Sequence, residues 1–248
     1  MSTLEIHQIP TRSDNYVYLL RESSSGNAAV IDPSDAEPVL ETLDMFGWNL
    51  THILATHHHN DHTAGVANIL SKHKALVYSS NKKIKYTTTI IKDKDIIDFD
   101  FIKIEVIATP GHTMDHVIFY NKENNILFSG DTLFRLGCGR VFEGSYRNMF
   151  SSLQKICALD DTTTVYCGHE YTNTNLSFLL DTFPENLDLI NEKKKINLQL
   201  KLQGSSIPFN LGREKKLNPF LGHKLEYSEK FKNVKNLYGF KLFSYLRD

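Results

Sequence analysis

Four histidines and one aspartate fall within seven residues of the chain, in the run Thr56-His57-His58-His59-Asn60-Asp61-His62. Imidazole is the commonest metal ligand in proteins, and carboxylates add oxygen donors. A short apolar run, residues 53–56, precedes them, so we expect the cluster where a strand passes into a loop and then a helix. Residues two apart at such an edge point the same way, which groups His57 with His59 and leaves Asp61 and His62 on the next helix. One short segment can therefore serve two neighbouring metal sites.

Three more donors stand just past three other predicted strands, each beside a glycine that lets the backbone turn tightly: His112, Asp131 and His169. Convergence of the four strand ends would collect seven donors: His57, His59, Asp61, His62, His112, Asp131 and His169. Seven are too many for one tetrahedral zinc. They suit two metals about 3.5–4 Å apart that share a bridging carboxylate, for which Asp131 is the candidate.

The other histidines and cysteines have ordinary explanations, because a lone imidazole is more often a hydrogen-bonded core or surface group than a ligand. We interpret four scattered histidines in this way: His7, His52, His73 and His223. His58 alternates away from its two neighbours and is left out of the ligand set. His116 would at most support the ligands. Cys167 is expected to be a buried, unreactive thiol.

The elements that must position these donors alternate between strand and helix as far as residue 169. Residues 17–20 and 28–31 predict paired strands with a turn at 23–26, and apolar spacing predicts a helix that Gly47 ends. After residue 169 the pattern predicts helices and no strand. We therefore expect one domain over residues 1–169, which contains all seven donors, and a helical domain over residues 170–248.

The composition is that of an ordinary globular protein, with 248 residues, 41% hydrophobic and 23% charged. A net charge of −1 gives no field that would attract nucleic acid or an acidic membrane surface. No apolar run reaches the roughly 18 residues of a membrane helix, and the first residues lack the pattern of a signal peptide. Three cysteines predict no disulfide framework. We expect a cytoplasmic monomer that binds neither nucleic acid nor membrane.

The histidine run, followed by His112, Asp131 and His169, resembles the metallo-β-lactamase superfamily. Residues 134–144 and 165–172 narrow the resemblance to the glyoxalase II family, the hydroxyacylglutathione hydrolases. The helical tail and the sequence Asn218-Pro219-Phe220 are similar to that family's C-terminal domain. The likeness covers nearly the whole chain.

The resemblance implies an α/β fold, the αββα metallo-β-lactamase-like sandwich with the metals at one edge and a C-terminal all-helical domain that helps to form the substrate cleft. It also implies two divalent cations per chain, zinc first, with iron and manganese as alternatives. One cation would take His57, His59 and His112. The other would take Asp61, His62 and His169, and Asp131 would bridge the two.

The implied reaction is hydrolysis of the thioester of an S-(2-hydroxyacyl)glutathione, such as S-lactoylglutathione, to glutathione and a 2-hydroxy acid, the second step of methylglyoxal detoxification. A metal-bound hydroxide that Asp61 or Asp131 orients would attack the acyl carbon. A thiol has a pKa of about 8.5, so a thiolate can leave without a dedicated general acid, whereas an amide nitrogen could not. No uncommitted acid stands out beside the ligand motifs, which favours a thioester over a peptide.

Three residues stand where relatives bind the substrate. Arg140 matches an arginine or lysine that lies near the glycine carboxylate of glutathione in relatives. Tyr171 matches a tyrosine that contacts the peptide backbone of glutathione, and Arg247 matches an arginine near the C-terminus of relatives. The sequence also departs from the family. Phe142 replaces a tyrosine of some relatives, and a lysine that others carry three residues beyond that arginine has no counterpart before Asp248.

Two alternative functions remain open. The first is another hydrolase of the same fold. The helical tail and the Asp61-His62 pair disfavour a β-lactamase, and the balanced charge disfavours a nuclease. A non-enzymatic metal-binding or redox module is the second alternative. A structural zinc site is closed by four protein ligands, whereas this sequence offers seven donors. Oxygen-reducing relatives replace one histidine of the motif by glutamate, whereas His59 is present here. Both observations disfavour this second alternative.

Overall fold

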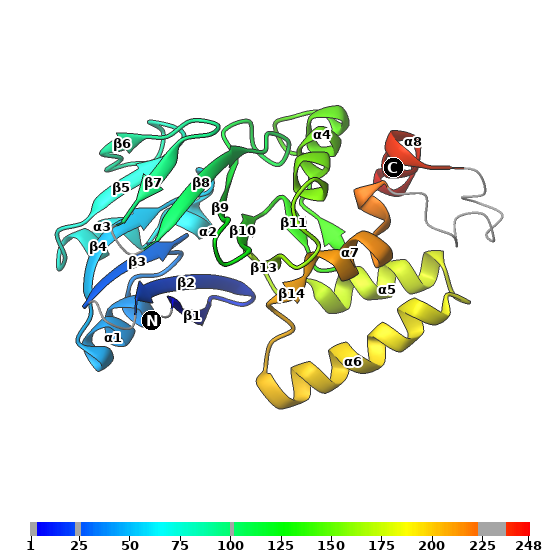
Figure 1. The fold of residues 1–248 in the computed structure, drawn as a ribbon, viewed down its shortest axis with the longest axis horizontal. Helices are drawn as coiled ribbons and strands as arrows, with labels where there is room; N and C mark the ends of the chain where they lie inside the picture. The colour runs from blue at the N-terminus through cyan, green and yellow to red at the C-terminus, as the bar shows by residue number, and fades with distance from the viewer. Residues whose placement is uncertain (1–3, 23–25, 100–101, 223–236) are drawn as a thin grey trace. The chain divides into compact units, whose positions relative to one another are not determined.

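The computed structural model describes residues 4–22, 26–99, 102–222 and 237–248 (Figure 1). Residue contacts group the chain into two compact units. Unit 1 comprises Met1–Ala108 with Asp115–Gly130, and unit 2 comprises Thr109–Met114 with Asp131–Asp248. Most of the expected turn at 23–26, and His223, lie outside the described residues. The domain boundary at 169/170 stays a prediction.

Unit 1 contains a six-stranded sheet with the order β1-β2-β3-β4-β5-β6. Its strands are β1 (Leu4–Thr11), β2 (Asn15–Glu22), β3 (Asn27–Ile31), β4 (Asn49–Leu54), β5 (Leu76–Ser79) and β6 (Thr89–Ile90). The first three strands run antiparallel, and β3 to β6 run parallel. The two strands predicted at 17–20 and 28–31 are confirmed as antiparallel neighbours, with Tyr18 opposite Ile31.

Three helices lie in the connections of this sheet: α1 (Glu37–Phe46), α2 (Asn60–Thr63) and α3 (Val66–Leu70). Gly47 ends α1 in the left-handed conformation, at φ 64°, as predicted. Val17 and Leu19 of β2 share one buried cluster with Val39 and Leu43 of α1. Alternate residues of β2 therefore bury one face of the sheet against helices.

The other face of β2 meets a second set of strands in the same unit. These are β7 (Ile96–Asp98), β8 (Lys103–Ala108), β9 (Val117–Asn121) and β10 (Ile126–Gly130), antiparallel in the order β10-β9-β8-β7. The rings of Tyr18 and Phe128 lie 5.4 Å apart, centroid to centroid, and both side chains are buried. Two sheets thus pack face to face, with helices on the outer side of the first (Figure 1).

Unit 2 is mainly helical. It contains β11 (Leu133–Phe134), β12 (Gly137–Cys138), α4 (Tyr146–Cys157), β13 (Thr164–Cys167), α5 (Thr172–Thr182), α6 (Leu187–Gln203), β14 (Phe209–Asn210), α7 (Leu211–Leu217), the 3-10 helix η1 (Pro219–Leu221) and α8 (Gly239–Arg247). The prediction of no strand after residue 169 is wrong, because β14 pairs antiparallel with β13. A two-residue strand is too short to show an alternating pattern. No described helix combines the length and apolar character needed to cross a membrane.

Candidate metal centre

The histidine-rich segment of unit 1 leaves the sheet at the end of β4 and enters α2. His57 is fully buried, and its Nε2 lies 3.0 Å from Nδ1 of His59, the residue that caps α2. His62 is also buried, and its Nε2 lies 3.7 Å from Oδ2 of Asp61. Both pairs thus bring together atoms that can ligate a cation, from six consecutive residues.

Unit 2 contributes a second set of three buried donors. His112 follows β8 by four residues, Asp131 directly follows β10, and His169 follows β13 by two. Oδ2 of Asp131 lies 3.4 Å from Nε2 of His112 and 3.4 Å from Nε2 of His169. One carboxylate oxygen therefore stands at nearly equal distance from two imidazoles.

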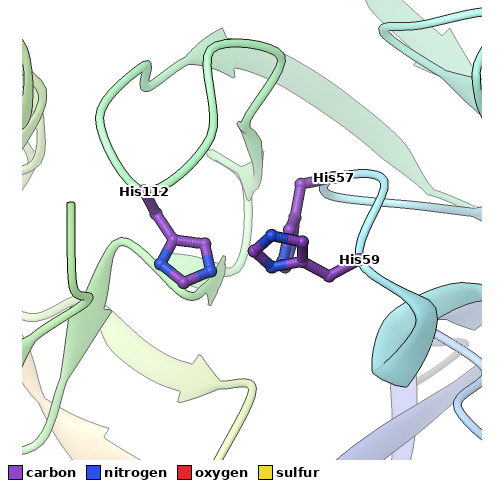
Figure 2. Close-up of side chains that lie close together, drawn as sticks. All are labelled: His57, His59 and His112. Atoms are coloured by element: carbon purple, nitrogen blue, oxygen red, sulfur yellow. The ribbon is translucent and has the colours of Figure 1, made fainter. Parts of the chain in front are cut away.

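Three groups of these donors have ligand atoms within 4.8 Å of one another: His57, His59 and His112; His57, His62 and Asp131; Asp61, His62 and His169. Figure 2 shows the first group, with the rings of His57 and His59 projecting from one loop and the ring of His112 from another. Imidazole nitrogens and carboxylate oxygens are donors that zinc, iron and manganese accept. The chemistry of the donor set therefore fits divalent transition-metal ions.

Asp32 is a buried residue of this region that sequence reasoning missed. It follows β3 with φ 51°, and its Oδ1 accepts a hydrogen bond from the backbone N–H of Thr56 at 2.7 Å. Its Oδ2 accepts from Thr56 Oγ1 at 2.7 Å and lies 3.0 Å from Nδ1 of His62. Asp32 therefore ties the end of β4 to the histidine on α2.

For three of the candidate ligand histidines, the hydrogen bonds decide which ring nitrogen carries the lone pair. Because Thr56 Oγ1 donates to Asp32, it accepts from Nδ1 of His57, 3.0 Å away, and His57 keeps its lone pair on Nε2. His62 likewise donates from Nδ1 to Asp32, and His112 donates from Nδ1 to the carbonyl of Arg140 at 2.8 Å. All three imidazoles then present Nε2 as a ligand atom.

Two glycines allow the backbone to pass close to the donors. Gly130 has φ 47°, and a Cβ there would lie 2.8 Å from Thr56 Oγ1 and 2.9 Å from His116 Nε2. A Cβ on Gly139 would collide with the carbonyl oxygen of Asp131. A side chain at either position would therefore displace Asp131 or the groups behind His57.

Residues that we left out of the ligand set have other partners. Nδ1 of His58 lies 2.8 Å from Oδ1 of Asp115. The buried ring of His116 stacks on the ring of His57, with 4.9 Å between centroids. Burial raises the pKa of the Cys167 thiol above its ordinary value, so it stays protonated at neutral pH, and the S–H donates to the carbonyl of His169.

The three residues expected to bind substrate lie in different surroundings within unit 2. Arg140 is exposed, and its carbonyl holds His112. The ring of Tyr171 stacks on the ring of His169, with 4.7 Å between centroids and 5° between planes. The guanidinium of Arg247 lies 5.9 Å from the centre of the Phe220 ring.

Phe142 is an exposed aromatic residue beside a metal-ligand candidate. Its ring meets the ring of His112 edge-on at 5.1 Å, and 62% of its surface is exposed. An exposed phenyl ring at this place offers an apolar contact where a tyrosine would add a hydroxyl.

Comparison with known proteins finds two family models on the chain. One, described as the metallo-beta-lactamase superfamily, matches residues 10–169. The other, described as the hydroxyacylglutathione hydrolase C-terminus, matches residues 170–248. Together they account for all but the first nine residues.

Curated relatives and solved structures are similar over most of the chain. The hydroxyacylglutathione hydrolase of Rhodospirillum rubrum is 43% identical over 226 residues, 89% of this chain and 88% of its own. The hydroxyacylglutathione hydrolase of Rhodopseudomonas palustris (strain HaA2) is 41% identical over 220 residues, which are 88% of this chain and 86% of its own. The crystal structure of ETHE1 from Myxococcus xanthus has a TM-score of 0.68 and 26% identity, and covers 94% of this chain and 90% of its own. The predicted α/β fold with a helical C-terminal region is confirmed.

Proposed function

Because the chain belongs to the hydroxyacylglutathione hydrolase family of the metallo-β-lactamase superfamily, we propose that it hydrolyses the thioester of S-(2-hydroxyacyl)glutathiones with water that two divalent cations activate. The observation that carries this proposal is that the group of His57, His62 and Asp131 overlaps both other groups, with His57 also in the first and His62 also in the third. A single closed structural site would use four donors. Seven donors in overlapping groups favour a pair of cations with positions left for water.

We assign one cation to His57, His59 and His112, the other to Asp61, His62 and His169, and the bridge to Asp131. The position of the Asp131 carboxylate supports the bridge, because its Oδ2 lies 3.4 Å from one histidine of each set. Zinc is the proposed metal, with iron and manganese as alternatives, because imidazole suits zinc and iron, and carboxylate oxygen suits manganese.

When bound, such cations supply hydroxide at neutral pH and polarise the substrate carbonyl. Asp61 or Asp131 accepts the hydrogen bond of the attacking hydroxide and directs its oxygen at the acyl carbon. The departing thiolate is stable enough near neutral pH to leave without a proton donor, since a thiol has a pKa of about 8.5. The absence of an assigned general acid is thus compatible with thioester cleavage.

The glutathione half of the substrate is assigned to Arg140, Tyr171 and Arg247. Arg140 is exposed on the segment whose carbonyl holds His112, and Tyr171 stacks on His169, so both stand next to proposed metal ligands. A guanidinium binds a carboxylate through two parallel hydrogen bonds, which suits the carboxylates of glutathione. We further propose that the protein works in the cytoplasm as a monomer and binds no nucleic acid.

The activity is tested on protein stripped of metal with a chelator and titrated with zinc, with S-lactoylglutathione as substrate. The proposal expects no turnover before metal is added and full turnover at two equivalents. S-methylglutathione, a thioether, is the control that must not be cleaved. Turnover by the stripped protein, or faster hydrolysis of a β-lactam than of the thioester, would overturn the proposal.

Arg140→Ala tests the substrate assignment. Loss of a charged hydrogen bond present in both ground and transition states should raise KM roughly tenfold and change kcat little. Arg147→Ala, which removes an exposed arginine from α4, is the matched control. An unchanged KM in Arg140→Ala would remove this residue from the substrate site.

A further inference from the structure

The turn between β1 and β2 contacts the histidine-rich segment. Asn15, the first residue of β2, is buried, with 4% of its surface exposed. Its Nδ2 donates to the carbonyl oxygen of Asp61 at 3.1 Å and to Asp61 Oδ2 at 3.3 Å. One amide group therefore holds both the backbone and the carboxylate of a proposed metal ligand.

The neighbouring residues of the turn hold the same segment. Arg12, in the left-handed conformation at φ 51°, donates from Nη2 to the carbonyl of Ser34 at 3.0 Å and to that of Asn60 at 3.4 Å. Its Nε lies 3.7 Å from Oδ1 of Asp35. The turn thus connects the loop after β3 with the first residue of α2, and Asn15 is fixed between paired strands on one side and α2 on the other.

Asp61 needs such a partner. It stands in a helix of only four residues, and 35% of its side chain is exposed. A half-buried carboxylate on a short helix gains from being held in one rotamer, because ordering a side chain costs free energy each time a cation binds. A neutral amide removes this freedom without cancelling the negative charge that attracts the cation.

We propose that Asn15 is a positioning residue that sets the Asp61 carboxylate for the cation assigned to Asp61, His62 and His169. This inference rests on the proposed function, because it concerns the same pair of cations. It predicts that a change at Asn15 weakens the binding of one of the two cations selectively, because Asn15 contacts both the backbone and the carboxylate of Asp61, a ligand assigned to that cation.

The test compares Asn15→Ala and Asn15→Asp with Ser13→Ala, a change at an exposed residue of the same turn. Zinc binding is measured by titration and by elemental analysis after dialysis, and folding without metal is measured by thermal unfolding. Loss of a partner behind a metal ligand typically costs 10- to 100-fold in affinity. Asn15→Ala should therefore lose about tenfold or more at one cation and keep the other. Asn15→Asp has the same shape but places a second acceptor against Asp61, and should lose at least as much.

Two equally tight zinc ions in both Asn15 variants would overturn the inference. An equal loss of affinity for both zinc ions would also overturn the inference, and so would failure of both variants to fold when Ser13→Ala folds. Either result would show that Asn15 has a general structural role. If the unchanged protein binds fewer than two zinc ions or does not cleave the thioester, the proposed function fails instead. The two failures are therefore distinguishable.

Discussion

At three candidate ligand histidines, the nitrogen turned away from the other donors is held by a neighbouring oxygen. Asp32 holds His62 directly and His57 through Thr56, and the carbonyl of Arg140 holds His112. These partners fix the ring orientation and leave the lone pair on Nε2. A proposed metal ligand here is thus an imidazole together with the group behind it.

Asp32→Asn should remove this control over His62. The amide of asparagine can donate to Nδ1, which would move the histidine proton to Nε2 and block that ligand atom. We expect zinc affinity to fall about 10- to 100-fold at the cation assigned to His62, and to fall also at the cation assigned to His57, because Thr56 Oγ1 bonds the same oxygen of Asp32. Titration measures both. Asp44→Asn, on the exposed side of α1, is the control and should bind zinc as the unchanged protein does. Unchanged affinity in Asp32→Asn would contradict the role given to Asp32.

Sequence reasoning found the metal-ligand candidates and missed Asp32, for a physical reason. Four histidines in seven residues stand out against any ordinary composition. A single aspartate before Pro33 suits the end of a strand, so its type and position do not mark it as a partner of a histidine. Only the fold brings Asp32 to Thr56 and His62, which lie 24 and 30 residues further along the chain.

At the scale of elements, the hairpin of β11 and β12 is held by residues of α7 and its end. Leu136 has φ 60°, a conformation that costs a side-chain-bearing residue about 1 kcal/mol or more. Glu214 Oε2 accepts from the backbone N–H of Leu136 at 2.8 Å, and Nδ2 of Asn218 donates both to Glu214 Oε2 and to the carbonyl of Gly137 at 3.0 Å. These bonds stabilise the turn that leads to Arg140.

The carboxyl of Glu214 makes the stability of this hairpin depend on pH. Burial raises its pKa from the ordinary 4.5 to about 7. Because the folded pKa exceeds the unfolded one, the folded state binds the proton more tightly. The resulting stabilisation is complete below about pH 4.5 and is lost as pH rises through 7.

Glu214→Gln should remove this dependence, because an amide does not ionise. The free energy of unfolding of the variant, relative to the unchanged protein, should rise by about 3 kcal/mol between pH 4.5 and pH 8. Urea unfolding at several pH values measures the difference, and all other titrating groups are common to the two proteins. A difference that stays constant across this range would show that Glu214 has no raised pKa.

Elements with a long pattern were predictable, and short ones were not. The strands β2 and β3 are continuous apolar runs because both of their faces are buried, and the helix α1 buries one apolar stripe, so each leaves a readable pattern. The strand β14 has two residues, and it forms because β13 offers it an edge. Its existence depends on a partner over 40 residues away in the sequence, which no local pattern records.

At the scale of the whole molecule, unit 2 has a buried ionic network. Arg135, 8% exposed, donates to Glu192 at 3.0 Å, to Gln199 at 2.8 Å and to the carbonyl of Ser206 at 2.6 Å. Arg213 binds the other oxygen of Glu192 at 3.1 Å. The network joins the hairpin of β11 and β12 to α6 and α7. The stability of unit 2 therefore depends on every charged member of the network keeping its partner.

Glu192→Ala should destabilise the protein strongly, because it leaves the buried guanidinium of Arg135 without its carboxylate. Breaking a buried pair in this way costs about 3–5 kcal/mol. Asp98→Ala, which breaks the exposed pair with Lys103, should cost about 1 kcal/mol or less. Urea unfolding of both variants checks the contrast, and equal losses would mean that the buried network adds nothing specific.

In the proposed site, one chain holds two cations with Asp131 between them. The most direct measurement is a crystal structure of the zinc-loaded protein with anomalous data at the zinc edge. We expect two anomalous peaks about 3.5–4 Å apart, with Asp131 coordinating both and three further donors at each. One peak, or two peaks that Asp131 does not connect, would contradict it.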